Sequence, residues 1–135
     1  MRLSPRTGAG VGVSILVVDD AADTRELIVH ILHDGGYGEV IQASSGESAQ
    51  EIIEAKDSQI GLVLLDVNLP ALNGLELCRR LRADRRLKNL PVIVVTAMQD
   101  EQTLAQSFAA GATDFLGKPV RPMELLARVK SALRL

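Results

Sequence analysis

The sequence has very few aromatic residues, with no tryptophan, one tyrosine and two phenylalanines among its 135 residues. Proteins that bind single-stranded nucleic acid stack the bases on aromatic side chains, so this scarcity argues against such a surface. The formal net charge is -2, which gives no electrostatic reason to expect nucleic acid or an anionic membrane as a partner. We therefore expect no direct nucleic-acid binding and no membrane binding.

A single cysteine, Cys78, excludes an intrachain disulfide and fits a reducing compartment. Long apolar runs are also lacking, since none approaches the about 18 residues that a membrane helix requires. The apolar segment 11–18 follows Arg2 and Arg6, but it ends in two aspartates without a small-residue cleavage site, unlike an export signal. These absences predict a cytoplasmic protein.

The length and the composition, 47% hydrophobic and 24% charged, are those of one globular domain. Residues 1–13 are rich in Gly, Ser, Thr and Pro, so we predict a flexible N-terminal tail followed by a folded domain over 14–135. Gly8, Gly10 and Gly12 resemble part of a dinucleotide-binding fingerprint. That fingerprint must follow a strand, whereas these glycines precede the first one, so we do not predict nucleotide binding there.

Short apolar segments alternate with segments of helical periodicity along the whole domain. Strands are predicted over residues 14–18, 39–43, 62–66, 91–95 and 113–116. Helices are predicted over residues 22–34, 46–56 and 100–110, with two more beginning at residues 74 and 122. The third strand is a continuous apolar run, which is typical of a parallel strand covered on both faces. The alternation predicts an α/β fold, a doubly wound five-stranded parallel sheet with five helices.

Two groups of side chains within these helices have alternative interpretations. The first helix has a predicted buried stripe at helical spacing: Leu27, Ile28, Ile31 and Leu32. His30 and His33 on the same helix could hold a metal, but no other ligand is near in sequence, so we favour a solvated surface. Residues 79–88 are strongly basic and could bind nucleic acid, but Asp84 interrupts them, and a solvated helix and loop is the preferred interpretation.

The predicted strands end in polar or charged residues of a restricted kind. The first strand is followed by Asp19 and Asp20, the third ends in Asp66, the fourth in Thr96, and the fifth leads to Lys118. Because open parallel sheets place their binding crevices at the carboxyl ends of the strands, we expect these side chains to meet. Polar residues that merely end strands would not explain three carboxylates, a lysine and a hydroxyl together. We therefore predict a functional site.

The residue types indicate the chemistry of this site. Three close carboxylates repel one another unless a cation lies among them, and carboxylate oxygens at an open sheet edge suit Mg²⁺. Lys118 can pair with a carboxylate or with a phosphate, and the Thr96 hydroxyl can donate to a phosphate oxygen. This set is suited to bringing a phosphoryl group to a carboxylate, a transfer that depends on positioning and charge neutralisation.

Four motifs in order resemble one known family. The motifs occupy residues 15–20, 64–70 with Gly74, 94–97 and 111–119. Together they resemble the receiver domain of bacterial response regulators, the CheY-like family of two-component signalling systems. The resemblance extends from about residue 14 to residue 135 and implies a flavodoxin-like strand order of 2-1-3-4-5.

The resemblance implies a role for each acidic residue. Asp66 would be the phosphoacceptor, taking the group from a sensor histidine kinase or a phosphotransfer protein and forming an aspartyl phosphate. Asp20, Asp66 and the backbone carbonyl of Asn68 would bind Mg²⁺ directly, while Asp19 would act through water. The protein would not be an enzyme in the ordinary sense, although it would assist its own phosphorylation and dephosphorylation.

The resemblance also implies a conformational switch. Thr96 and Lys118 would hold the phosphoryl oxygens, and Phe115 would turn inward as Thr96 moves towards the phosphoryl group. The change would alter the surface formed by the fourth helix, the fifth strand and the fifth helix, which would bind a downstream protein or form a phosphorylation-dependent dimer. The Lys118–Pro119 peptide bond would be cis, which an X-Pro bond tolerates.

Three other functions remain as alternatives. A haloacid-dehalogenase-type phosphatase also forms an aspartyl phosphate, but it needs a second aspartate where this chain has Asn68. A flavodoxin needs a hydroxyl-rich loop after the first strand, where Asp19 and Asp20 would repel the flavin phosphate. A degenerate receiver could serve only as a protein-interaction module, although the intact acidic and lysine positions argue against this.

Overall fold

The computed structural model describes residues 13–56 and 59–134, and these residues form five strands, five α-helices and one short 3-10 helix. The strands are β1 (Ser14–Val18), β2 (Val40–Ala43), β3 (Ile60–Leu65), β4 (Val92–Thr96) and β5 (Asp114–Gly117). The helices are α1 (Ala22–Asp34), α2 (Gly46–Lys56), α3 (Gly74–Ala83), α4 (Glu101–Ala109) and α5 (Pro122–Leu133), and the 3-10 helix is η1 (Arg85–Leu87). The predicted tail, residues 1–13, lies outside the described residues except for Val13.

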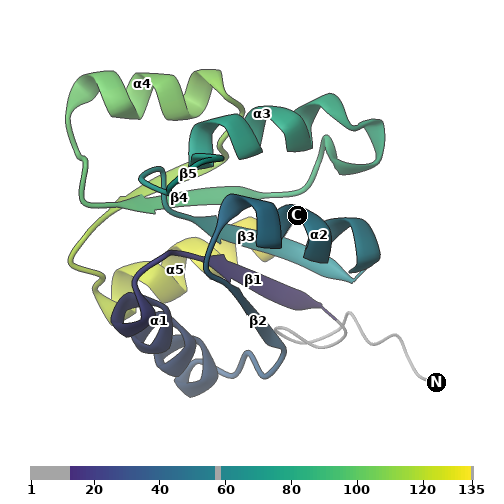
Figure 1. Ribbon diagram of the computed structural model, residues 1–135. Helices are drawn as coiled ribbons and strands as arrows, with labels where there is room; N and C mark the ends of the chain where they lie inside the picture. Colours follow the sequence, from purple (N-terminus) through teal and green to yellow (C-terminus); the bar gives the residue numbers. More distant parts are fainter. Residues whose placement is uncertain (1–12, 57–58, 135) are drawn as a thin grey trace.

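The strands form one sheet in the order β2-β1-β3-β4-β5, and every neighbouring pair is parallel. Figure 1 shows α1 and α5 together on one side of this sheet and α3 with α4 on the other. A crossover between parallel strands must pass over a face of the sheet, which accounts for helices on both faces. The predicted doubly wound fold and strand order are confirmed.

The core lies in two layers because successive residues of a strand point to opposite faces. In β1, Leu16 and Val18 pack on the side of α2 and α3, whereas Ile15 and Val17 pack on the side of α1 and α5. Strand β3 is buried along nearly its whole length, as its continuous apolar sequence predicts. The central strands are therefore held from both sides, which fixes the positions of the residues that follow them.

Some element boundaries differ from the prediction by one residue. Strand β3 ends at Leu65, so Asp66 is the first residue of the loop, although its N–H still donates to the Val18 carbonyl at 3.0 Å. Thr96 is the last residue of β4 rather than the residue after it. The Lys118–Pro119 peptide bond after β5 is cis, as the resemblance implies.

The predicted buried stripe of α1 is wrong at one position. Ile28, Ile31 and Leu32 are buried, but Leu27 is 46% exposed. Successive residues of a helix are separated by about 100° around its axis, so Leu27 lies at the edge of the face centred on Ile28 and turns towards solvent. The exposed position of Leu27 shows that the apolar face of α1 is narrower than the sequence suggests.

Glycines follow the carboxyl ends of two helices, α1 and α4. Gly36 and Gly111 have φ values of 97° and 107°, a backbone conformation that other residues rarely adopt. At the amino end of α3, the Asn73 side chain accepts a hydrogen bond from the Glu76 N–H at 2.9 Å and caps the helix. None of the helices in the described ranges has the combination of length and apolar character needed to cross a bilayer.

Candidate functional site

Three of the predicted site residues lie together because each directly follows the carboxyl end of a strand in the same parallel sheet. Val18 of β1 pairs with Leu65 of β3, so the residues that follow them, Asp19 and Asp66, lie side by side. Strand β5 lies next to β4 at the same edge, and Lys118 follows directly after it. The predicted convergence at the carboxyl ends of the strands is therefore present.

Lys118 forms the centre of this group of side chains. Its Nζ lies 2.7 Å from Asp19 Oδ2 and 2.9 Å from Asp66 Oδ2. The Asp19 side chain is 2% exposed and the Asp66 side chain 7% exposed. One ammonium therefore forms ion pairs with two carboxylates in a poorly solvated site. Buried carboxylates are costly unless a cation and hydrogen bonds satisfy them, and Lys118 provides both.

The environment also perturbs the lysine. Burial of the ammonium favours its neutral form, but the hydrogen bonds and charges of Asp19 and Asp66 outweigh this effect and raise the pKa of Lys118 above its ordinary value. Lys118 is therefore positively charged throughout the physiological pH range. A permanent positive charge beside Asp66 is available to any anionic group that approaches from solvent.

Asp20 completes an acidic cluster with Asp19 and Asp66. One carboxylate oxygen from each of the three residues lies within 4.8 Å of the others. Asp20 is exposed, whereas its two neighbours are buried, so the cluster opens to solvent on one side. Hard oxygen donors with solvent access fit Mg²⁺, which retains several waters and accepts only one or two carboxylates. The donor set thus fits the cation that the sequence predicts.

Backbone contacts fix the two buried carboxylates. Asp66 Oδ1 accepts a hydrogen bond from the Asn68 N–H at 3.1 Å, and Asp19 Oδ1 accepts one from the Ala21 N–H at 2.9 Å. Arg25 of α1 donates to the Asp19 carbonyl at 2.8 Å. Sequence reasoning missed Arg25, because a solvated arginine and an anchoring arginine look alike in a helical pattern.

Thr96 lies near this group, but its side chain does not join the group's hydrogen bonds. The residue is buried, and its Oγ1 accepts a hydrogen bond from the Met98 N–H at 3.3 Å. The hydroxyl is thus engaged within its own loop. The side chains of Asp19, Asp66 and Lys118 are directly connected in the described structure, while Thr96 contacts Lys118 through its backbone carbonyl, which accepts from the Lys118 N–H at 2.9 Å.

Phe115 is partly buried in β5, on the same side of the sheet as α3. It packs against a small apolar cluster of Val67, Val94 and Ala112. Val67 directly follows Asp66, so this aromatic ring and the acidic site share a neighbouring segment. Phe115 is therefore neither fully buried in the core nor fully exposed.

The alternative sites considered from the sequence are explained by other contacts. His30 and His33 are exposed, and His30 pairs with Asp34 at 3.3 Å across one turn of α1. In the basic segment, Arg82 is an exception to the predicted solvated surface, since its Nε donates to the Gly111 carbonyl at 2.9 Å. Burial raises the pKa of the Cys78 thiol despite the guanidinium of Arg82, which favours the inert protonated form.

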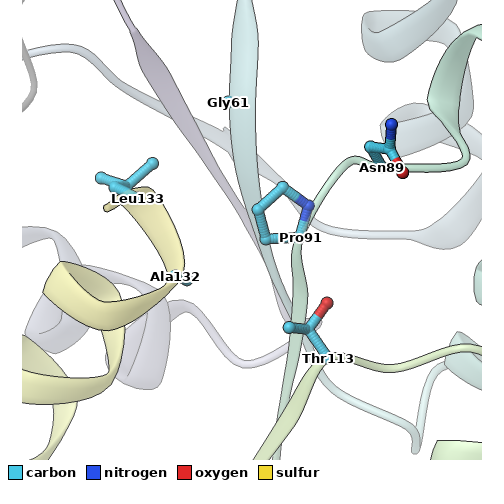
Figure 2. Close-up of a pocket in the computed structure, with 6 residues that line it drawn as sticks. All are labelled: Gly61, Asn89, Pro91, Thr113, Ala132 and Leu133. Atoms are coloured by element: carbon cyan, nitrogen blue, oxygen red, sulfur yellow. The ribbon is translucent and has the colours of Figure 1, made fainter. Parts of the chain in front are cut away.

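A cavity of about 450 Å³ lies at the opposite edge of the sheet, at the amino ends of β3, β4 and β5 (Figure 2). Its lining residues are Gly61, Asn89, Pro91, Thr113, Ala132 and Leu133. The Thr113 hydroxyl already accepts a hydrogen bond from the Val92 N–H at 3.0 Å, and no lining residue is charged. The carboxyl edge, with its three carboxylates and lysine, remains the candidate site.

A flavodoxin-like sheet with an acidic cluster and a lysine at its carboxyl edge defines the class of CheY-like α/β proteins. The chain belongs to the response regulator receiver domain family, whose model matches residues 15–130. It is therefore a receiver domain of two-component signal transduction. The members of this family are signalling domains rather than enzymes in the ordinary sense.

The phosphate regulon transcriptional regulatory protein PhoB of Pseudomonas aeruginosa is 41% identical over 124 residues, covering 92% of this chain and 53% of that protein. The chain thus spans about half the length of the curated relatives it matches. A proposed response regulator from Chloroflexus aurantiacus has a TM-score of 0.86 and 37% identity, covering 91% of this chain and 98% of the other. CheY in the CheX–CheY–BeF3–Mg²⁺ complex of Borrelia burgdorferi has a TM-score of 0.82 and 28% identity, covering 88% and 87% respectively.

Proposed function

We propose that Asp66 accepts a phosphoryl group from a sensor histidine kinase or a phosphotransfer protein. The proposal rests chiefly on one observation, the Asp66 carboxylate held by Lys118 beside Asp19 and Asp20. Asp66 is buried enough to be well positioned, yet the exposed Asp20 keeps the cluster open to solvent. A buried carboxylate with only a structural role would not need two further aspartates beside it.

The transfer itself is a displacement at phosphorus. An oxygen of the Asp66 carboxylate forms a bond to the phosphorus while the bond from phosphorus to the donor's imidazole nitrogen breaks. The nitrogen retains the electron pair, and Asp66 becomes an acyl phosphate. Because the Asp66 carboxylate is held by hydrogen bonds from the Asn68 N–H and the Lys118 ammonium, the protein contributes orientation and charge neutralisation to the transfer.

Asp20, Asp66 and the Asn68 backbone carbonyl would hold Mg²⁺, and Asp19 would act through an intervening water. The fit is supported by the three carboxylate oxygens that lie within 4.8 Å of one another. When bound, the cation would supply positive charge to the carboxylates and the phosphoryl oxygens. A structural relative comes from the CheX–CheY–BeF3–Mg²⁺ complex of Borrelia burgdorferi, which supports Mg²⁺ as the cation here.

Lys118 and Thr96 would hold the phosphoryl oxygens once Asp66 is modified. Phosphorylation adds roughly -1.5 to -2 charge and three acceptor oxygens. Lys118 is already in contact with Asp66 and can turn to a phosphoryl oxygen with little movement. The Thr96 hydroxyl, which accepts its present hydrogen bond from the Met98 N–H, keeps its proton free to donate.

The proposed output is a change in the surface formed by α4, β5 and α5. Movement of Thr96 towards the phosphoryl group would make room for Phe115 to turn inward. The outer face of α4 exposes Leu104 and Phe108, and Met98 is exposed in the loop before it. Apolar side chains in this position favour a partner protein or a second phosphorylated copy as the ligand of the surface.

Intact-mass analysis after incubation with acetyl phosphate and Mg²⁺ tests this proposal. We expect the wild type to gain the mass of one phosphoryl group and Asp66→Asn to gain none. A chelator such as EDTA should abolish the gain. The exposed Asp23→Asn serves as a matched control, because Asp23 lies in α1 outside the acidic cluster. Labelling that survives Asp66→Asn would show that another residue is the acceptor, and labelling in EDTA would exclude the metal.

A further inference from the structure

Gln99, in the loop between β4 and α4, contacts the backbone of the site lysine. Its Nε2 donates a hydrogen bond to the Lys118 carbonyl at 2.8 Å. The Lys118 N–H donates to the Thr96 carbonyl at 2.9 Å. Both peptide groups that flank the Lys118 Cα are therefore tied to one segment, the end of β4 and the loop that follows it.

The residue before Lys118 leaves room for this contact. Gly117 is the strand partner of Thr96, and the Gln99 carboxamide lies over its Cα. A Cβ at position 117 would overlap the carboxamide and would lie 2.8 Å from Nε2. A Cβ in real structures essentially never comes closer than 3.0 Å to such an atom. The absence of a side chain at 117 and the reach of Gln99 are therefore complementary features.

The hydrogen bond crosses an open part of the surface. A cavity of about 200 Å³ is lined by Gln99, Gly117, Lys118, Pro119, Arg121 and Glu124. The Lys118 carbonyl is consequently held by a specific hydrogen bond beside an opening, not by close packing of apolar side chains. Removal of the Gln99 carboxamide would free this peptide group to move.

We propose that Gln99 is a positioning residue that holds the Lys118 backbone, so that the ammonium remains directed at Asp66. This inference rests on the proposed function of Asp66 as phosphoacceptor. A lysine has a flexible four-carbon side chain, so the position of its ammonium depends on the backbone from which it extends. Small displacements of a group that stabilises a transferring phosphoryl have large effects on rate.

Gln99 also connects Lys118 to the proposed switch. It follows Met98, whose N–H is bonded to the Thr96 hydroxyl at 3.3 Å. When Thr96 leaves this bond for a phosphoryl oxygen, the loop that contains Gln99 is released from one of its constraints. The hydrogen bond from Gln99 then couples the Lys118 backbone to the loop as the loop moves, so that Thr96 and Lys118 contact the phosphoryl group together.

Variants of Gln99 test the role through the rate of phosphorylation. With acetyl phosphate and Mg²⁺, Gln99→Ala should lower the rate constant of labelling about three- to tenfold, the effect expected from one hydrogen bond. Gln99→Glu should behave likewise because a carboxylate cannot donate. Gln102→Ala is the matched control, since Gln102 is an exposed glutamine in α4, and it should label at the wild-type rate. Wild-type rates in both Gln99 variants would overturn the proposal.

A second variant distinguishes the contact from a general effect on the loop. Gly117→Ala should displace the Gln99 carboxamide and slow labelling to a similar extent. The double variant Gly117→Ala/Gln99→Ala should be no slower than the slower single variant, because both changes break the same contact. Multiplication of the two effects in the double variant would show that they act independently and would contradict the proposal.

Nuclear magnetic resonance provides a test that does not depend on labelling. In Gln99→Ala, the Lys118 backbone and ammonium resonances should shift or broaden, while Gln102→Ala leaves them unchanged. If the wild type takes up no phosphoryl group, the proposed function fails and these resonances decide the inference alone. Unchanged Lys118 resonances in Gln99→Ala would overturn it, whereas a shift confined to the Gln99 variants would uphold it.

Discussion

Replacement of Gly74 by alanine tests how closely α3 must approach the backbone of the proposed phosphoacceptor. Gly74 is the first residue of α3, and its N–H donates to the Val67 carbonyl at 3.0 Å. A Cβ at this position would lie 2.9 Å from the Val67 Cα and closer still to the Asp66 carbonyl oxygen. These are backbone atoms, so no rotation of a side chain can relieve the overlap.

The expected loss of stability follows from two opposing effects. Overpacking of a close contact costs about 1–3 kcal/mol, and a contact between backbone atoms belongs at the upper end of this range. Alanine regains up to about 1 kcal/mol because it favours the helix and restricts the unfolded chain. The net loss for Gly74→Ala is therefore about 2 kcal/mol. For a domain of this size, this corresponds to a decrease of about 6–10 °C in Tm.

Gly38→Ala is the matched control for this measurement. Among the described residues, no heavy atom lies within 4 Å of the position that a Cβ of residue 38 would occupy, in the loop between α1 and β2. The same change of residue type should therefore leave stability unchanged or raise it by up to about 1 kcal/mol. Because both variants restrict the unfolded chain in the same way, their difference in urea unfolding isolates the contact in the native state.

The functional consequence follows from the position of Asp66. If α3 and the loop after β3 must separate, the Asp66 backbone moves and its carboxylate no longer faces Lys118 at 2.9 Å. We expect Gly74→Ala to slow labelling by tenfold or more, because displacements near 1 Å can cost about 100-fold. Equal unfolding free energies for Gly74→Ala and Gly38→Ala would refute the steric argument. Wild-type labelling by Gly74→Ala would refute its link to the site.

Two further predictions concern charged residues. Arg82→Ala should lower the free energy of urea unfolding by about 1–3 kcal/mol, because Arg82 donates to the Gly111 and Leu87 carbonyls. Arg79 is exposed, so Arg79→Ala should change this free energy by less than about 0.5 kcal/mol. Equal effects of the two variants would contradict an anchoring role for Arg82. The raised pKa of Lys118 means that its ion pairs with Asp19 and Asp66 stabilise the folded state fully at pH values below the pKa of an unfolded lysine, about 10.4. This stabilisation is lost as the pH rises through the higher pKa of Lys118 in the folded state. The difference in unfolding free energy between wild type and Lys118→Met should therefore be constant between about pH 7 and 9 and shrink above about pH 10.5, whereas parallel pH profiles would argue against the ion pairs.

The sheet and the acidic edge were predictable because their determinants are local in sequence. Strands β1 and β3 are each followed directly by aspartate, β4 ends in Thr96 and β5 is followed by Lys118, and the parallel arrangement brings such strand ends together. Asp19 and Asp66 are separated by 47 positions in the chain (66 minus 19), yet the pairing of Val18 with Leu65 makes them neighbours. Prediction of the site therefore required only the strand ends and the parallel fold.

Contacts between segments without a local pattern could not be predicted. Arg82 lies within a basic segment, and nothing in that segment distinguishes it from Arg79, which is exposed and pairs with Glu76. The carbonyl that Arg82 contacts belongs to Gly111, which follows α4 and lies 29 residues later in the chain. Gln99 is likewise one polar loop residue among several, and the glycine that accommodates it is on another strand.

Helix α4 is attached to the sheet through unusually polar contacts. Its buried residues are Thr103 and Ser107, while Leu104 and Phe108 on its outer face are exposed. Full burial of a leucine or phenylalanine contributes about 1.5–3 kcal/mol, and the small hydroxyl side chains that replace them contribute far less. Less free energy therefore holds α4 in place than holds a helix such as α5, whose buried face includes Leu125.

This weak attachment matters because the free energy available to the proposed switch is limited. A shift of a two-state equilibrium from 1:99 to 99:1 needs about 5.5 kcal/mol of differential stabilisation. Hydrogen bonds from Thr96 and Lys118 to a phosphoryl group would contribute about 1.5–3 kcal/mol each, or about 3–6 kcal/mol together, so they reach this requirement only near the upper end of the range. If α4 were held by buried leucines, the same two contacts could not move it. The polar inner face of α4 is therefore the feature that would allow one modified aspartate to change a surface on the neighbouring elements.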